Sequence, residues 1–134
     1  MATQNLTEAT FTNAITNNSI VLVDFWASWC GPCRAFAPTY SQASEKHPDI
    51  VFAKVDTESE QGLAATAGIQ SIPTLMAFRD QILVFSQPGA LRLADIEEVI
   101  AAVRALDMGD VIRSIEEQRA APAAPAGATS ATAR

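Results

Sequence analysis

Short apolar runs alternate along this chain with segments whose apolar residues recur every three or four positions. Short runs rich in β-branched and aromatic side chains are typical of strands, and the longer spacing is typical of helices. The predicted strands are residues 20–26, 51–56, 74–79 and 82–85. The predicted helices are residues 33–46, 60–67 and 93–105, the first continuing through Pro38 and the second ending at Gly68.

The start of the chain carries weaker signals. Residues 1–6 predict a short edge strand, and Thr7 is placed to cap a helix that ends near Asn17. The apolar side chains expected on one face of that helix are Phe11, Ala14 and Ile15.

The order of these elements predicts the fold class. Strand, helix and strand in succession favour parallel pairing with a right-handed crossover. The last two strands are joined around residues 80 and 81, which predicts an antiparallel pair. We therefore expect an α/β domain with a central mixed sheet and helices on both faces.

The composition changes toward the C-terminus. Asp110 is placed to cap a short extra helix, whose apolar face would hold Val111, Ile112 and Ile115. Residues 120–134 are mainly alanine with prolines, which predicts a disordered tail. The predicted parts are a domain over 1–106, a helical extension over 107–119 and the tail over 120–134. We expect the extension to dock on its own domain.

The two cysteines lie where the first buried strand gives way to a helix, in the motif Trp29-Cys30-Gly31-Pro32-Cys33. Unpaired backbone N–H groups at a helix start carry a partial positive charge, which favours the thiolate form of Cys30. Cys33 falls on the same side of the first turn, within reach of a disulfide. Gly31 permits the tight turn, and Pro32 costs little because an N–H there would have had no partner. The spacing predicts a reversible dithiol.

Half of a zinc site, or two inert buried thiols, is the alternative for this pair. A structural zinc site usually takes four ligands, and beyond the cysteines the chain offers one histidine, His47. His47 stands near the end of a predicted helix, where a histidine is favourable. A redox pair is therefore the preferred interpretation.

Asp24 is an acid inside the apolar strand 20–26. Burial of a carboxylate disfavours its charged form and raises its pKa, so such a group can exchange protons near neutrality. The alternative is an aspartate near the strand end that faces solvent.

Composition and charge limit the classes of partner. The chain has 134 residues, enough for one domain with a core, and 49% of them are hydrophobic. Its formal net charge of −6 argues against nucleic acid or an anionic membrane as the main partner. Residues 1–19 lack the features of a secretory signal, and no run reaches membrane-spanning length. We expect a cytoplasmic location, where cysteines at this spacing suit catalysis better than a permanent disulfide.

Three motifs of the chain together resemble the thioredoxin family. They are Trp29-Cys30-Gly31-Pro32-Cys33, the preceding Phe25-Trp26-Ala27 and the later Ile72-Pro73-Thr74. The resemblance runs in order and spacing from about Leu6 to about Leu106, and it includes the proline within the second helix. It implies the thioredoxin fold, and the extra C-terminal helix lies outside it.

The resemblance also implies roles for single residues. Cys30 would be the nucleophile and Cys33 the resolving cysteine, with Asp24 beneath Cys33 as its proton acceptor through water. Lys54, on the neighbouring strand, would modulate Asp24 by its charge. From the pattern alone, Lys54 is one polar residue in an alternating strand.

The resemblance further implies a cis proline at Pro73, opposite the dithiol, so that the backbone of Ile72 can pair with an extended substrate segment. Without the resemblance an ordinary trans proline would be favoured. The implied substrate-binding residues are Trp29, Gly31, Pro32, Ile72, Pro73, Gly89 and Ala90.

The implied activity is general reduction of protein disulfides by thiol–disulfide exchange, with no cofactor on this chain. The implied partners are disulfide-containing client proteins and a flavin-containing, NADPH-dependent thioredoxin reductase, and we expect a monomer. Two alternatives remain: a thiol oxidoreductase specialised for one client, and a redox-independent binding module on the same fold.

Three residues depart from the family pattern. Ser71 stands where glycine is frequent before the Ile-Pro pair, and Gln81 replaces the usual glycine between the last two strands. Pro88 stiffens the loop before Gly89. Asp80 is then left to adopt any left-handed turn conformation. These departures bear on partner selectivity and on the choice of reductase rather than on the dithiol.

Overall fold

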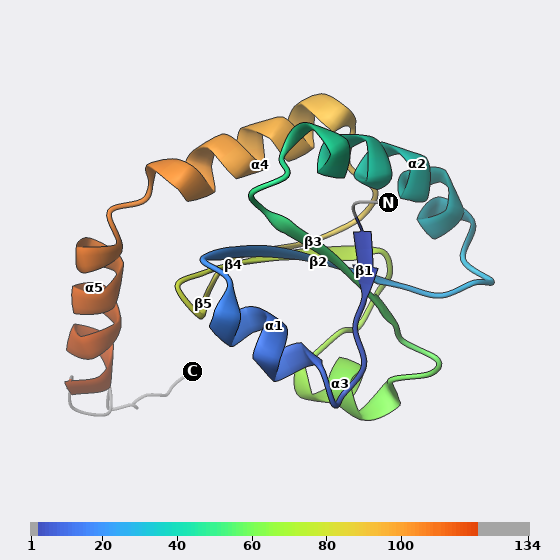
Figure 1. The fold of residues 1–134 in the computed structure, drawn as a ribbon. Coiled ribbons are helices and arrows are strands. Elements are labelled where there is room, and N and C mark those ends of the chain that lie inside the picture. The colour runs from blue at the N-terminus through green and yellow to red at the C-terminus, as the bar shows by residue number, and fades with distance from the viewer. Residues whose placement is uncertain (1–2, 121–134) are drawn as a thin grey trace, which may run out of the picture. The chain divides into compact units, whose positions relative to one another are not determined.

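The computed structural model of the chain describes residues 3–120 (Figure 1). They fall into two compact units, divided between Arg104 and Ala105. The strands are β1 (Thr3–Asn5), β2 (Ile20–Trp26), β3 (Val51–Asp56), β4 (Thr74–Arg79) and β5 (Ile82–Pro88). The helices that begin before the division are α1 (Phe11–Asn17), α2 (Gly31–Lys46), α3 (Gln61–Thr66) and α4 (Leu93–Ala105).

The five strands form one sheet in the order β1-β3-β2-β4-β5. β3 pairs in parallel with β1 and β2, whereas β4 runs antiparallel to both β2 and β5. Figure 1 shows α2 and α4 on one face of this sheet and α1 and α3 on the other. The predicted α/β fold with a mixed, doubly covered sheet is therefore confirmed.

The central strand β2 contributes to a core on each face, because successive side chains of a strand point to opposite faces. Leu22 packs with α2 and α4 residues in one cluster. Val21, Val23 and Phe25 pack with residues of α1 and α3 in the other. By the same alternation, the side chain of Asp24 belongs to the face that α2 and α4 cover.

Helix α2 connects the cysteine motif to this core. It begins at Gly31, two residues before the predicted start, and it continues through Pro38 to Lys46. Its buried Tyr40 donates a hydrogen bond of 2.8 Å to the carbonyl oxygen of Ala53 in β3. The long helix is therefore held against the sheet below the turns that carry the cysteines.

The predicted cap of the first helix is wrong. The N-cap of α1 is Thr10, not Thr7. Thr7 instead forms a turn before the helix: its N–H donates to the Thr10 hydroxyl at 2.9 Å, and its carbonyl accepts from Phe11 at 3.0 Å. Threonines three residues apart compete for such bonds, and the local pattern does not say which one ends up at the cap.

The turn between β4 and β5 holds two residues in the left-handed region. Asp80 has φ 51°, as predicted, and Gln81 has φ 72°. Two-residue hairpin turns of this kind favour glycine at the second position, because a side chain there is strained. The left-handed conformation of Gln81 therefore lowers the stability of the folded domain.

Replacing Gln81 by glycine is expected to stabilise the domain. Relief of the left-handed conformation is worth roughly 1–2 kcal/mol, and the added freedom of the unfolded chain offsets roughly 0.5–1 kcal/mol of it. Urea unfolding should therefore show a gain of about 0.5–1 kcal/mol. The matched control is Gln87→Gly within β5, which should lose stability; a loss for both variants would contradict the expectation.

The second unit contains α5 (Met108–Ala120). The predicted cap is wrong here too, since a side-chain oxygen of Asp107 accepts from the Asp110 N–H at 3.1 Å. Asp110 lies inside the first turn and forms an ion pair with Arg113. The expected tail falls outside the described residues except for Ala120, and the domain limits and the docking of the extension stay predictions.

Candidate active site

The two cysteines lie at the start of α2 and are joined by a disulfide. Cys30 is the N-cap residue, Cys33 follows in the first turn, and their Cα atoms are 5.2 Å apart. The predicted placement of the pair at a strand–helix joint is therefore confirmed, and the two sulfurs are bonded to each other. Among residues 3–120, no three His, Cys, Asp or Glu side chains are grouped so that they could hold a metal ion.

The backbone around Cys30 favours negative charge on its sulfur. The Cys33 N–H donates to the Cys30 Sγ at 3.2 Å. This bond adds to the partial positive charge of the helix start, and both favour a thiolate over a thiol in the reduced protein. Cys30 is 5% exposed and Cys33 is 3% exposed, so a partner must approach closely to reach either sulfur.

A brace that sequence reasoning missed holds the loop before the dithiol. The Arg34 side chain reaches back from α2, and its Nη1 donates to the carbonyl oxygen of Ser28 at 2.9 Å. The Cys30 N–H also donates to Ala27, at 3.2 Å. These two hydrogen bonds fix the conformation of the loop that carries Trp29. An arginine next to the motif is the sequence signal, but its partner depends on the turn geometry.

Asp24 is fully buried in the middle of β2. Burial raises its pKa from 3.8 to about 7, and the positive charge of Lys54 partly opposes this shift. Neither carboxyl oxygen has a hydrogen-bond partner among residues 3–120. The expectation of a buried acid with a raised pKa is therefore confirmed, and the solvent-facing alternative is excluded.

Lys54 lies directly opposite Asp24 in the register of β2 and β3. Its Nζ is 5.1 Å from the centre of the Trp26 ring, within the range of a cation–π contact. Trp26 in turn packs against the small cluster of Ala27, Cys30 and Cys33. Trp26 therefore connects the acid–lysine pair to the dithiol. Strand alternation could have found it, because Trp26 is two residues beyond Asp24.

The segment opposite the dithiol has the predicted cis peptide bond, between Ile72 and Pro73. The Ile72 carbonyl oxygen lies 3.7 Å from the Cys30 Sγ, and the Ile72 side chain packs against the cysteine cluster. The Gly89 N–H donates to the Pro73 carbonyl at 2.7 Å, with Gly89 at φ 102°. The segment that carries Gly89 is thereby hydrogen-bonded to the segment that carries Pro73.

The remaining rim residues are exposed. Trp29 has 65% of its surface accessible, the largest value among the large hydrophobic side chains described. Gly31, Pro32 and Ala90 are also exposed. An exposed indole beside two nearly buried sulfurs is an apolar surface available for contact with another protein.

His47 ends α2, as predicted, but it also makes contacts that the sequence did not indicate. Its Nε2 lies 2.7 Å from a Glu97 carboxyl oxygen, and its Nδ1 lies 3.3 Å from Arg104. Arg104 is in turn paired with Asp49 at 2.8 Å. These contacts connect the end of α2 to α4 and have no part in the dithiol site.

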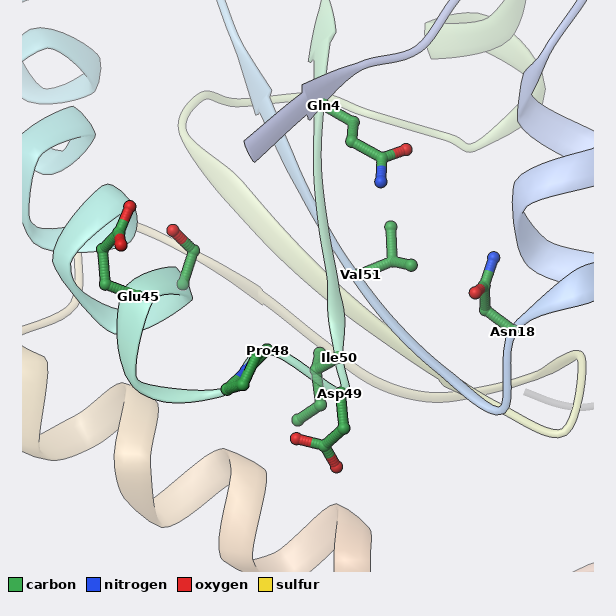
Figure 2. A pocket seen from close by; sticks show the side chains of 8 residues that line it. Gln4, Asn18, Glu45, Pro48, Asp49, Ile50 and Val51 are labelled. Carbon is green, nitrogen blue, oxygen red and sulfur yellow. The ribbon is translucent and has the colours of Figure 1, made fainter. Parts of the chain in front are cut away.

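A separate cavity of about 280 Å³ lies at the other end of the sheet. Figure 2 shows Gln4, Asn18, Glu45 and Asp49 among the side chains that line it. Val51 in its lining begins β3, whereas the dithiol follows the carboxyl end of β2. Ligand sites of open α/β sheets are found at the carboxyl ends of the strands, so this cavity is not part of the redox site.

Within the described part of the chain, no helix combines the length and the apolar character needed to span a membrane.

The thioredoxin family model matches residues 2–102. The chain is 51% identical over 119 residues to "Putative thioredoxin 2" of Streptomyces coelicolor, with 89% of each chain covered.

Two solved structures agree with this match. Plasmodium falciparum thioredoxin superposes with a TM-score of 0.69 and 32% identity, over 74% of this chain and 97% of that one. Thioredoxin F from spinach chloroplast superposes with a TM-score of 0.72 and 29% identity, over 78% of this chain and 95% of that one. Fold, bonded cysteine pair and sequence similarity all agree: this chain belongs to the thioredoxin family, the oxidoreductases that exchange dithiols for disulfides.

Proposed function

We propose that this chain reduces the disulfides of a broad set of client proteins, with Cys30 as the attacking residue and Cys33 as the resolving one. The observation that carries the assignment is the place of Cys30 at the N-cap of α2, where its sulfur accepts the Cys33 N–H. A thiolate is the nucleophile in exchange, and this position stabilises it.

The exchange has two steps. The Cys30 thiolate attacks one sulfur of the client disulfide, forms a mixed disulfide and releases the other client sulfur as a thiolate. Cys33 then loses its proton and attacks the Cys30 sulfur, so that the Cys30–Cys33 disulfide forms and the second client thiolate leaves. Two electrons pass to the client, and the enzyme ends with the bond that the structure contains.

Asp24 accepts the Cys33 proton in the second step, and Lys54 adjusts how readily it does so. A pKa of about 7 supports this role, since a base is most effective when its pKa is near the working pH. The carboxyl group lies on the sheet face that α2 covers. Lys54, opposite it in the register, lies over the Trp26 ring, and Trp26 packs against the cysteine cluster. We assign the proton transfer to a bridging water.

Clients bind as extended segments along the loop before Pro73. The backbone of Ile72 lies close to the Cys30 sulfur, which supports pairing between that backbone and the client chain. Trp29, Gly31, Pro32, Gly89 and Ala90 would form the rest of the contact surface. Their exposure supports a surface that accepts many sequences, because it offers few fixed polar partners.

Recycling is assigned to a flavin-containing, NADPH-dependent thioredoxin reductase, and the proposed location is the cytoplasm. Family membership supports both assignments, since a disulfide reductase must regain two electrons after each turnover. The compartment has to keep the dithiol reduced, as the cytoplasm does.

The test couples the chain to such a reductase and follows NADPH consumption with several unrelated protein disulfides. A general reductase should give kcat/KM values within about one order of magnitude of each other. The control is the double variant Cys30→Ser with Cys33→Ser, which should give no turnover. A strong preference for one client would identify a specialised oxidoreductase instead. Biological activity that survives in the double variant would identify a binding module.

A further inference from the structure

A second cavity, of about 200 Å³, lies beside the loop that faces the dithiol. It is lined by residues 67–71 between α3 and β4, by Thr74 and Met76 of β4, and by Ser86 and Pro88 of β5. We call it the Gln70 pocket. Small-molecule sites usually have volumes of roughly 300–1,000 Å³, so this smaller cavity suits a single side chain better than a separate ligand.

Two residues that line the Gln70 pocket directly precede, in the chain, the two segments near Cys30. Ser71 in its lining directly precedes Ile72, whose carbonyl oxygen is 3.7 Å from the Cys30 sulfur. Pro88 in its lining directly precedes Gly89, whose N–H is bonded to the Pro73 carbonyl at 2.7 Å. A client segment lying along Ile72 therefore passes the pocket within a few residues of its reacting cysteine.

The chemistry of the lining is polar but uncharged. None of the nine lining residues is ionisable. The Thr74 hydroxyl is already bonded to the Ser71 carbonyl at 2.6 Å, so the amide of Gln70 and the hydroxyls of Ser71 and Ser86 are the side-chain groups left to meet a ligand. Amides and hydroxyls both donate and accept hydrogen bonds. A charged side chain entering here would give up water without gaining an opposite charge.

We propose that the Gln70 pocket is a specificity subsite that binds a carboxamide side chain, glutamine or asparagine, of the client protein. Such a side chain matches the mixed donors and acceptors of the lining, and its aliphatic part matches Met76 and Pro88. The subsite rests on the proposed reductase function, because the client segment must lie along Ile72 to reach it.

The test uses disulfide-linked peptides in which each position flanking the reacting cysteine is varied among Gln, Glu, Lys and Leu. At one position, the wild-type chain should reduce the Gln peptide roughly tenfold faster in kcat/KM than the Glu or Lys peptide. Gln70→Glu places a negative charge in the exposed lining and should shift the preference at that same position to Lys.

The matched control is Gln87→Glu, which changes the net charge equally. Gln87 stands between two lining residues of β5, so its side chain points to the other face of the strand. It should keep the wild-type preference. Equal rates for all peptides at every position, or the same shift in both variants, would overturn the subsite.

Turnover of a small aromatic disulfide separates this proposal from the proposed function. Such a substrate is too short to reach the pocket, and both Glu variants should reduce it at the wild-type rate. If that rate persists while the peptide preference is absent, the subsite is wrong and the reductase function stands. If the wild-type chain fails to reduce the small disulfide at all, the reductase function fails first.

Discussion

Replacing Cys30 by serine is expected to abolish disulfide reduction, with a loss of at least roughly a thousandfold in kcat/KM. A serine hydroxyl at the N-cap keeps the hydrogen bond from the Cys33 N–H, so the helix start should stay intact. It is not ionised near neutrality and cannot form a mixed disulfide. Thiol trapping followed by mass measurement should find no covalent client complex.

The companion variant Cys33→Ser separates the two cysteine roles. It keeps the attacking thiolate but lacks the resolving thiol, so the mixed disulfide should accumulate instead of turning over. The expected species in the mass spectrum is one chain bound to one client. Accumulation in Cys30→Ser and not in Cys33→Ser would show that the roles are exchanged.

The second large effect is expected from Asp24→Asn, which keeps the shape of the side chain and removes its ability to accept a proton. The rate of the second step in the wild-type chain should rise with pH through about 7, the pKa of Asp24. In the variant this inflection should disappear, and the step at neutral pH should be about a hundredfold slower. Stopped-flow measurement of client release resolves this step from the first attack, which should not change.

The pH dependence of folding stability gives an independent test of the raised pKa of Asp24. In the folded state the pKa of Asp24 is about 7, above the ordinary value of 3.8, so the folded protein binds this proton more tightly than the unfolded chain. Stability from this group is therefore complete below pH 3.8 and is lost as the pH rises through about 7. The three-unit shift corresponds to a cost of about 4 kcal/mol above that range, at about 1.4 kcal/mol per unit.

Asp24→Asn should accordingly be more stable than the wild-type chain at pH 8 and close to it at pH 4, as measured by urea unfolding. The control is Asp80→Asn in the exposed turn, where loss of the charge should give nearly the same change at both pH values. A variant that is less stable at pH 8 would show that the buried carboxylate is stabilised by a contact that asparagine cannot make.

Local pattern was sufficient for the sheet and for the chemistry of its central strand. The run 20–26 is short, apolar and rich in β-branched side chains, and it became β2 with the predicted bounds. The apolar residues on either side of Asp24 identified it as an acid inside a core, and the Cys-X-X-Cys spacing identified the pair at the helix start. The cis bond at Pro73 came from family resemblance, because nothing local distinguishes it from a trans bond.

Contacts between distant segments could not be predicted in the same way. The Arg34 brace depends on how the loop turns back, and the contact between His47 and Glu97 joins residues 50 positions apart. The caps at Thr7 and Asp110 failed for a different reason. A second threonine or aspartate lay three residues away in each case, and both can bond the same backbone groups.

The chain has two cysteines, and both are in the active-site disulfide. Each molecule can therefore hold one client covalently at a time, and only Cys33 or an outside thiol can release it. A covalent dimer can form only through a cysteine that the reaction needs, so a disulfide-linked pair of these chains cannot complete the two-step exchange until that bond is reduced. Both cysteines are largely buried, which disfavours such a dimer. Two chains would have to bring the surfaces around their cysteines into contact before the sulfurs could bond.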